Sequence, residues 1–187
     1  MTRQADKTCQ KYDIVIASTT EGAATQLTNA LKRKYALELL TSVGMLACKP
    51  VSTPMVPNLK LSKTDVDLLE NREMYRSLVG RLMYLTITRP NITFAVNKLC
   101  QFSSVMRSSH LIAVYRVLQY IKGTVGQGLF YYVDSDLTLK GYADADYGSC
   151  KDSRRSTTGF SMVLGSSIIS WCSKKQPTVS RSSAEAE

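Results

Sequence analysis

Four acidic residues in the last part of the chain have the types and spacing that suit metal-ion chemistry. Asp144 and Asp146 stand two residues apart in LTLKGYADADYG, and Glu185 and Glu187 lie in SRSSAEAE. Side chains alternate along a strand, so both aspartates would point to one face. Paired carboxylates resist joint ionisation unless a cation lies between them, and magnesium prefers oxygen ligands. A glutamate from a crossing helix would complete a site able to align a phosphodiester for hydrolysis. By spacing alone, solvated residues at a strand end are the commoner alternative.

Strand-like segments connect these acids. GLFYYV and LTLKGYADADYG are strand-like, and STTGFSMVLG and SSIISWCSKK predict a β-hairpin around Gly165. SRSSAEAE predicts the start of a helix, because Ser182 or Ser183 can cap it and acids suit its first turn. We expect a mainly antiparallel sheet of three strands, with an exposed apolar patch and marginal stability. That patch would include Phe160, Met162, Ile169 and Trp171.

Helical periodicity dominates the chain before these strands. A helix is predicted after the short strand YDIVIASTT, with Gly44 as its stop. Further helices are predicted in DLLENREMYRSLVGRLMYLTI, RPNITFAVNKLCQF and SSHLIAVYRVLQYIKGT. Ser108 or Ser109 would cap the last of these, and His110 is interpreted as a structural cap or boundary residue, not as a catalytic base. The expected apolar faces are Leu78, Leu82 and Leu85, then Ile92, Val96, Leu99 and Phe102, then Leu111, Val114, Leu118 and Ile121.

A proline-rich segment divides the helices. ACKPVSTPMVPNLKL contains Pro50, Pro54 and Pro57, and proline disfavours helix at and before its own position. We therefore predict an α+β chain with four regions. They are a strand and helix in 1–48, a linker in 49–63, a helical connection in 64–126 and a sheet region in 127–187.

The composition favours a polyanionic partner. Lysine plus arginine minus the acids is 24 − 15 = +9, which suits nucleic acid, although a basic surface without a ligand is the alternative. The five cysteines and single histidine lack zinc spacing, and the odd cysteine count suggests reduced thiols. No apolar run approaches the roughly 20 residues of a membrane span, and the first residues do not resemble a signal peptide. We expect an intracellular protein, cytoplasmic or nuclear, with no membrane partner.

Several long segments resemble one family. LKGYADADYGSCKDSRRSTTGFSMVLGSSIISWCSKKQPTVSRSSAEAE strongly resembles the start of the ribonuclease H domain in copia-type retrotransposon Pol polyproteins. KYALELLTSVGMLACKPVSTPM, YRSLVGRLMYLTITRPNITFAVNKLCQF and HLIAVYRVLQYIKGT resemble the stretch that joins reverse transcriptase to that domain. The resemblance covers nearly everything from Arg33 onward. It implies a ribonuclease H-like sheet that is incomplete here.

The resemblance also implies roles for individual residues. Asp144 falls on the first catalytic carboxylate of the family and Glu187 on the next, with Asp146 as an accessory magnesium ligand. The family pattern includes two further aspartates downstream, which this sequence does not contain. The basic SKKQPTVSRSS segment would contact an RNA–DNA hybrid, and a solvated loop is an equally good interpretation. Its cations are Lys174, Lys175 and Arg181.

The amino end resembles the polymerase palm of the same family imperfectly. In KYDIVIAS only Asp13 occupies an acidic position, with Tyr12 where a second acid is expected. A polymerase needs paired aspartates to hold its metals. The family also has a further stretch between LTNALK and RKYALELL, so the sequence predicts an internal deletion at Lys32–Lys34. The 1–48 region would then be a reverse transcriptase remnant.

These observations predict a Pol fragment whose ancestral activities are RNA-directed DNA synthesis and RNA–DNA hybrid cleavage with magnesium. As it stands, the chain is expected to lack catalysis. One alternative is a residual nuclease whose missing acids come from a partner or an extension. Another is a basic, non-enzymatic fragment that binds nucleic acid or protein.

Overall fold

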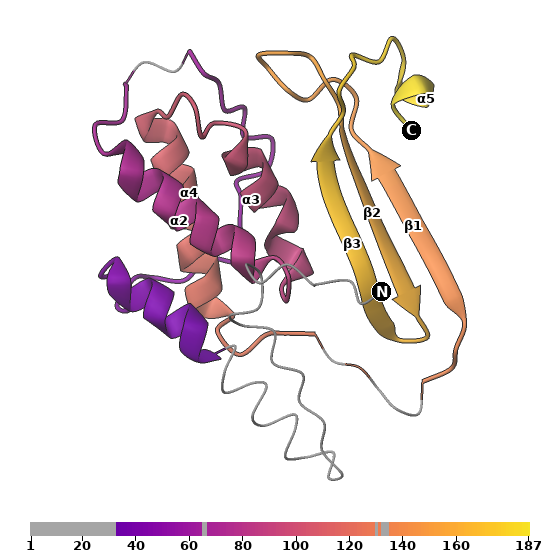
Figure 1. Ribbon diagram of the computed structural model, residues 1–187, viewed down its shortest axis with the longest axis horizontal. Helices are drawn as coiled ribbons and strands as arrows, with labels where there is room; N and C mark the ends of the chain where they lie inside the picture. The colour runs from indigo at the N-terminus through magenta and orange to yellow at the C-terminus, as the bar shows by residue number, and fades with distance from the viewer. Residues whose placement is uncertain (1–32, 65–66, 130, 132–134) are drawn as a thin grey trace, which may run out of the picture.

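Helices come first along the chain and strands follow. The computed structural model describes residues 33–64, 67–129, 131 and 135–187. Helices gather in one part of the molecule and an antiparallel sheet in the other (Figure 1), which confirms the α+β prediction. After a helical segment at 33–42, the elements are α2 (Arg72–Leu85), η1 (Pro90–Ile92), α3 (Thr93–Cys100), α4 (Ser108–Gly123), β1 (Leu139–Ala145), β2 (Thr157–Leu164), β3 (Ser167–Lys175) and α5 (Ser183–Ala186).

Apolar residues at helical spacing build the core between the helices. Helix α2 begins where the Asn71 side chain accepts a 2.9 Å hydrogen bond from the Met74 amide. Pro90 opens η1, where its missing amide is not needed. Of the predicted apolar faces, every residue is buried except Leu111, which is partly buried. Gly44 takes a positive φ of 67° just after the segment 33–42, as predicted. The start of that helix, the strand YDIVIASTT and the palm-like segment lie outside the described residues.

The start of α4 differs from the prediction. Arg107, not Ser108 or Ser109, is the N-cap residue, and its backbone amide donates to His110 Nδ1 at 3.1 Å. The His110 ring is fully buried, stacks on Phe102 and contacts the Ser62 carbonyl through Nε2 at 3.0 Å. The serine caps were thus wrong, whereas the interpretation of His110 as a structural cap agrees with its hydrogen bond from the Arg107 amide, and the ring also fills a core position.

The sheet has the order β1-β2-β3, and both pairs are antiparallel. Gly165, with φ of 57°, forms the expected turn between β2 and β3. In the register, Asp144 pairs with Gly159, which pairs in turn with Ser173. The three-strand prediction is confirmed. GLFYYV was a wrong prediction for residues 128, 129 and 131, which belong to no strand, and its other positions lie outside the described residues.

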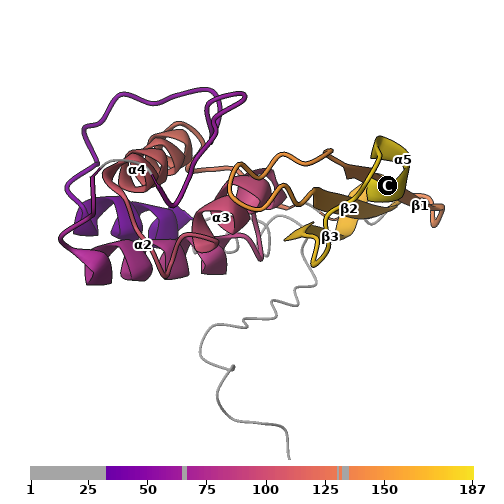
Figure 2. The ribbon, with the colours of Figure 1, turned by 90° about the horizontal axis from the view of Figure 1, so that it is seen from above.

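Helix α3 lies against β3 and fixes the sheet beside the helices. The Asn97 side-chain amide donates to the Ser173 carbonyl, and Trp171 Nε1 donates to the Thr86 carbonyl at 3.1 Å. Figure 2 shows the helices α2, α3 and α4 to one side of the sheet, with α3 nearest to it. This docking leaves Trp171 and Met162 partly buried, whereas Phe160 and Ile169 are 44% and 43% exposed. The predicted apolar patch is thus real at Phe160 and Ile169. None of the described helices has the length and apolar content needed to cross a bilayer.

Candidate functional site

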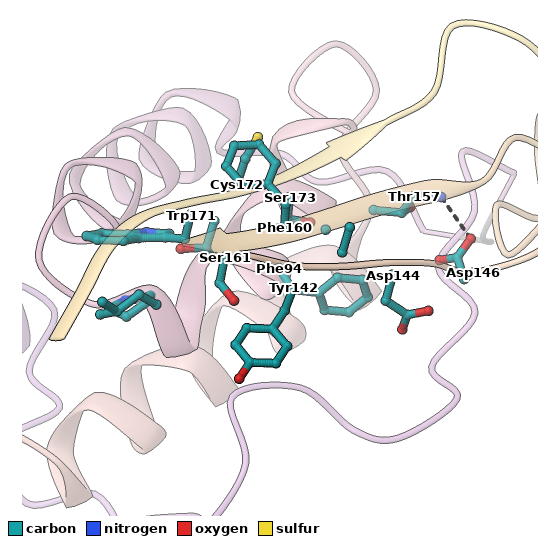
Figure 3. A pocket seen from close by; sticks show the side chains of 15 residues that line it. Phe94, Tyr142, Asp144, Asp146, Thr157, Phe160, Ser161, Trp171, Cys172 and Ser173 are labelled. Atoms are coloured by element: carbon teal, nitrogen blue, oxygen red, sulfur yellow. Dashed lines mark hydrogen bonds between the residues drawn. The ribbon is translucent and has the colours of Figure 1, made fainter. Parts of the chain in front are cut away.

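A pocket of about 430 Å³ opens between η1, the start of α3 and one face of the sheet. Aromatic residues from three elements line it: Phe94 of α3, Tyr142 of β1 and Trp171 of β3. Asp144 and Asp146 line it as well. Figure 3 shows Tyr142 and Asp144 on the same side of β1, with Cys172 pointing from the other face. The alternation that placed the two aspartates on one face therefore brings them into one pocket.

Asp144 is the accessible carboxylate of this pocket. It lies one residue before the end of β1, and its side chain is exposed. Within the described residues no hydrogen bond or ion pair engages its carboxylate. Opposite it stands Gly159, which carries no side chain that would cover it. The carboxylate is therefore open to an incoming ligand.

Asp146 has a structural role that its spacing did not reveal. Its Oδ1 accepts a 2.8 Å hydrogen bond from the Thr157 amide, drawn as a dashed line in Figure 3. Its Oδ2 accepts from Ser149 Oγ at 2.6 Å, and its own amide donates to the Thr157 carbonyl at 3.1 Å. These bonds close the loop between β1 and β2. Both carboxylate oxygens are thus engaged, so Asp146 is a poor candidate for a metal ligand in this conformation.

The two glutamates belong to α5 and its end. Ser182 caps α5 as predicted, with Oγ accepting from the Glu185 amide at 3.2 Å. Glu185 Oε2 in turn accepts from the Arg181 amide at 2.7 Å, which makes Glu185 a capping residue. Glu187 is exposed and does not line the pocket. In Figure 1, α5 lies near the end of β1 where Asp144 is found.

Gln176 holds α5 on the sheet. Its Nε2 donates to Thr158 Oγ1 at 2.8 Å and to the Ala186 carbonyl at 2.6 Å. Thr158 alternates with Thr157 and Gly159, both of which line the pocket, so it lies on the opposite face. Ala186 is buried. The anchor of α5 therefore sits on the face away from Asp144.

The residues present do not form a complete magnesium site. In the part of the chain that the structure describes, no group of three or more histidine, cysteine or acidic side chains comes together. Magnesium demands near-octahedral oxygen coordination, and here one unengaged carboxylate, Asp144, faces the pocket. Asp144, Asp146 and Glu187 are thus not gathered into the predicted three-carboxylate site. Magnesium binding stays a prediction.

The predicted nucleic-acid contacts have different surroundings. Lys174 and Arg181 are exposed, and the Arg181 carbonyl accepts from Tyr147 Oη at 3.0 Å. Lys175 alternates with Lys174 and is partly buried, with Nζ 2.8 Å from Cys150 Sγ. Two of the three cations are therefore available at the surface, whereas Lys175 is engaged by a thiol.

Cys150 lies beside a cation that the sequence did not indicate. Partial burial pushes the pKa of its thiol up, but the hydrogen bond from the Lys175 ammonium and nearby amides bring the pKa down to about 7. Lys175 lies 25 positions away in sequence, so no local motif could indicate the pair.

Asp152 is bonded to residues far from it in sequence. Among the described residues its carboxylate forms no ion pair with the neighbouring Arg154 or Arg155. Ser62 Oγ donates to Asp152 Oδ1 at 2.5 Å, and the Lys63 amide donates to Oδ2 at 3.0 Å. Partial burial raises the pKa of Asp152, but these bonds and the charges of Lys63 and Lys175 lower it overall. The loop after β1 is thereby joined to the predicted linker.

Fold and pocket together define a mixed α+β protein with an accessible strand carboxylate beside an aromatic pocket. No protein-family model matches the chain, and no solved structure matches it. Curated relatives do. The retrovirus-related Pol polyprotein from transposon RE1 of Arabidopsis thaliana is 46% identical over 156 residues, which is 83% of this chain and 11% of that protein.

Two shorter proteins are also similar. An uncharacterized mitochondrial protein of Arabidopsis thaliana is 46% identical over 154 residues, 82% of this chain and 64% of that protein. A secreted RxLR effector protein of Plasmopara viticola is 44% identical over 114 residues, 60% of this chain and 80% of that protein. The chain belongs to the retrovirus-related Pol polyproteins of copia-type transposons. It spans about a tenth of the length of the Pol polyproteins from RE1 and RE2.

Proposed function

We propose that this chain is a nucleic-acid-binding part of a copia-type Pol protein that does not cleave by itself. Its ancestral setting would be RNA-directed DNA synthesis and removal of RNA from RNA–DNA hybrids. The region 64–126 would be the connection, and 127–187 would be the first part of a ribonuclease H-like domain. The observation that carries the proposal is the exposed Asp144 carboxylate on β1, which belongs to no cluster of three or more acidic, histidine or cysteine side chains among the described residues, in a chain whose formal charge is +9.

The arrangement of acids supports the absence of cleavage. Asp146 is committed to the loop that it closes, and Glu185 caps α5. Among the described residues that line the pocket, Asp144 therefore has no second acidic side chain free to share a cation. Hydrolysis of a phosphodiester by cations requires several oxygen donors to align the attacking and leaving groups. A single free carboxylate does not supply them.

Surface charge supports binding. Lys174 and Arg181 are exposed near the end of the sheet that carries Asp144, and neither side chain is engaged by an acid within the described residues. Lysine and arginine contacts to phosphate release counterions, which lowers the binding constant steeply as salt rises. We therefore expect the chain to bind an RNA–DNA hybrid mainly by contacts to the sugar–phosphate backbone of the hybrid.

The test uses the full 187-residue chain with a fluorescently labelled RNA–DNA hybrid and magnesium. Anisotropy should report binding that weakens with salt, and gel analysis should show an uncut RNA strand. Hybrid-dependent cleavage that is lost in Asp144→Asn would overturn the proposal that the chain does not cleave. An affinity that does not change with salt concentration would overturn the proposal that the protein binds the phosphates of the hybrid backbone.

A double variant tests whether Lys174 and Arg181 contact the phosphates of the hybrid. Lys174→Gln with Arg181→Gln should flatten the logarithmic salt dependence by about 0.9 for each phosphate that the protein no longer neutralises. Arg33→Gln with Lys34→Gln is the matched control, because it also removes two exposed cations, here from the segment 33–42. An equal effect of both changes would mean that binding follows net charge and not this surface.

A second candidate is a non-enzymatic fragment that binds protein. It is favoured by one comparison, since a protein named as a secreted effector contains a related segment covering 60% of this chain. The same anisotropy experiment separates the two candidates. Absence of nucleic-acid binding at low salt would favour the protein-binding fragment.

A further inference from the structure

Two buried hydroxyls of the pocket lining have no hydrogen-bond partner among the described residues. Ser173 is 7% exposed, and its Oγ forms no hydrogen bond within the described residues. Thr93 Oγ1 is likewise buried and unpartnered there. Both residues line the pocket, Thr93 from α3 and Ser173 from β3. Buried polar groups are nearly always hydrogen-bonded, so these hydroxyls indicate a polar ligand between the helix and the sheet.

The walls between these hydroxyls are aromatic. Phe94 and Tyr142 expose 46% and 60% of their surface, which is costly for rings unless something covers them. Trp171 is held in place by its hydrogen bond to the Thr86 carbonyl. Phe94, Tyr142 and Trp171 thus line one pocket, and the indole ring of Trp171 is fixed by its hydrogen bond. Flat aromatic ligands stack on such surfaces.

The charge of the lining narrows the ligand class. Among the described residues that line the pocket, the charged ones are Asp144 and Asp146, and Lys98 Nζ lies over the Phe94 ring, 5.7 Å from its centroid. Beside the exposed Asp144 carboxylate a phosphate group would be repelled, whereas an N–H donor would be attracted. The two hydroxyls can each donate or accept. A planar heterocycle that carries both N–H donors and ring acceptors matches these groups, with any attached phosphate outside.

We propose that this pocket binds a single unstacked nucleobase. The base would lie against the aromatic residues, with Ser173 and Thr93 at its edge and Asp144 accepting from an exocyclic amine. The volume of about 430 Å³ falls within the range of small-ligand pockets. This inference deepens the proposed nucleic-acid binding and rests on it for the source of the base.

The test uses the fluorescence of Trp171, the single tryptophan of the chain. Adenosine and cytidine, which carry exocyclic amines and no phosphate, are titrated into the full chain without magnesium. We expect saturable quenching that changes little with salt, because no phosphate is involved. Phe94→Leu and Ser173→Ala should each weaken the apparent affinity several-fold. Leu139→Ala is the control, since Leu139 is an exposed β1 residue outside the pocket lining and should leave the affinity unchanged.

A second arm identifies the source of the base. A short single-stranded oligonucleotide should quench the Trp171 fluorescence at lower concentration than the free nucleosides. An abasic oligonucleotide of equal length should not quench it. If nucleosides quench saturably and the oligonucleotide does not, the pocket binds free nucleosides. That result would overturn the proposal that the base comes from a nucleic-acid strand. Absent quenching, or quenching that Phe94→Leu and Ser173→Ala leave intact, would overturn the site itself. Circular dichroism checks that both variants fold.

The two proposals can fail independently. One outcome is that nucleosides quench the Trp171 fluorescence while the anisotropy shows no hybrid binding, or binding that does not change with salt. In that case the nucleobase pocket is supported and the proposed binding to the hybrid backbone is overturned. If anisotropy behaves as expected while nucleosides do not quench, the pocket fails alone. Lys174→Gln with Arg181→Gln should keep the nucleoside quenching, because neither residue lines the pocket.

Discussion

The Ser62 hydroxyl donates a 2.5 Å hydrogen bond to Asp152 Oδ1, which joins residues 90 positions apart in sequence. The Ser62 carbonyl meanwhile contacts His110 Nε2 at 3.0 Å. One buried serine therefore connects the first turn of α4 with the loop that follows β1. The segment predicted as a linker is in this way tied to both the helices and the sheet.

Replacing Asp152 should loosen this connection. Asp152→Ala removes the acceptors of Ser62 Oγ and the Lys63 amide, and we expect a loss of about 1 kcal/mol because the carboxylate is largely exposed. The folded pKa of Asp152 is lowered, so its stabilisation is present above the ordinary carboxyl value of 3.8 and is lost as the pH falls below it through the folded pKa.

Urea unfolding of both proteins at neutral pH and in acid measures this difference. The midpoints should differ at neutral pH and converge once Asp152 is protonated. A gap that persists in acid would show that the charge of Asp152 is not what stabilises the junction. Asp136→Ala is a control, since Asp136 lies in the irregular segment before β1.

The two pocket aspartates should respond differently to substitution. Asp146→Ala leaves the Thr157 amide and Ser149 hydroxyl without their acceptor, and we expect a loss of about 1–3 kcal/mol in unfolding free energy. Asp144→Ala removes no such bond and should change stability by less than about 0.5 kcal/mol. Chemical denaturation of the two variants gives the comparison. Equal losses would contradict the division into a structural and an open carboxylate.

Substitution of Gln176 alone should detach α5 from the sheet. Gln176→Ala removes the donors to Thr158 Oγ1 and to the Ala186 carbonyl. We expect faster hydrogen exchange in residues 183–187, with little change in α2, because exchange there reports local opening. Ser180→Ala is the matched control, since it removes the bond to Gln176 Oε1 and leaves both of those hydrogen bonds in place. Unchanged exchange in Gln176→Ala would show that another group anchors α5.

Cys150 should alkylate at lower pH than an ordinary cysteine. The thiolate reacts and the thiol does not, so the rate with iodoacetamide should rise with pH through an inflection near 7. Lys175→Met removes the ammonium beside the sulfur and should move the inflection toward 9.0, the ordinary value for this group. Peptide mass spectrometry assigns the alkylation to Cys150. An inflection that Lys175→Met leaves unchanged would refute the pairing with Lys175.

The sequence predicted those parts that depend on neighbours along the chain. Apolar residues such as Leu78 and Leu82 mark a buried helix face wherever the helix packs, because their spacing follows the helical repeat. Alternation likewise placed Asp144 and Asp146 on one face of β1. GLFYYV shows the limit of this logic, since a strand also needs a partner, and pairing is not visible in the segment itself.

The details of the site depend on residues far apart in sequence. Asp146 differs from Asp144 because the chain returns at Thr157 to donate a hydrogen bond, and spacing cannot show that return. The pocket is lined by Thr93 of α3 and Ser173 of β3, and hydrogen bonds from Asn97 to the Ser173 carbonyl and from Trp171 to the Thr86 carbonyl hold β3 beside the helices. Cys150 and Lys175 meet for a similar reason.

The meander order of β1, β2 and β3 has a consequence for how the protein reaches its structure. Each strand pairs with the next one along the chain, and the helices pack against near neighbours too, so most of these pairings are available soon after synthesis of each segment. Pairing between segments that follow one another in the chain closes shorter loops than pairing between distant segments, which favours rapid folding. The bonds of Trp171 to Thr86 and of Ser62 to Asp152 would then form last. Weakening them should accelerate unfolding while leaving the refolding rate almost unchanged.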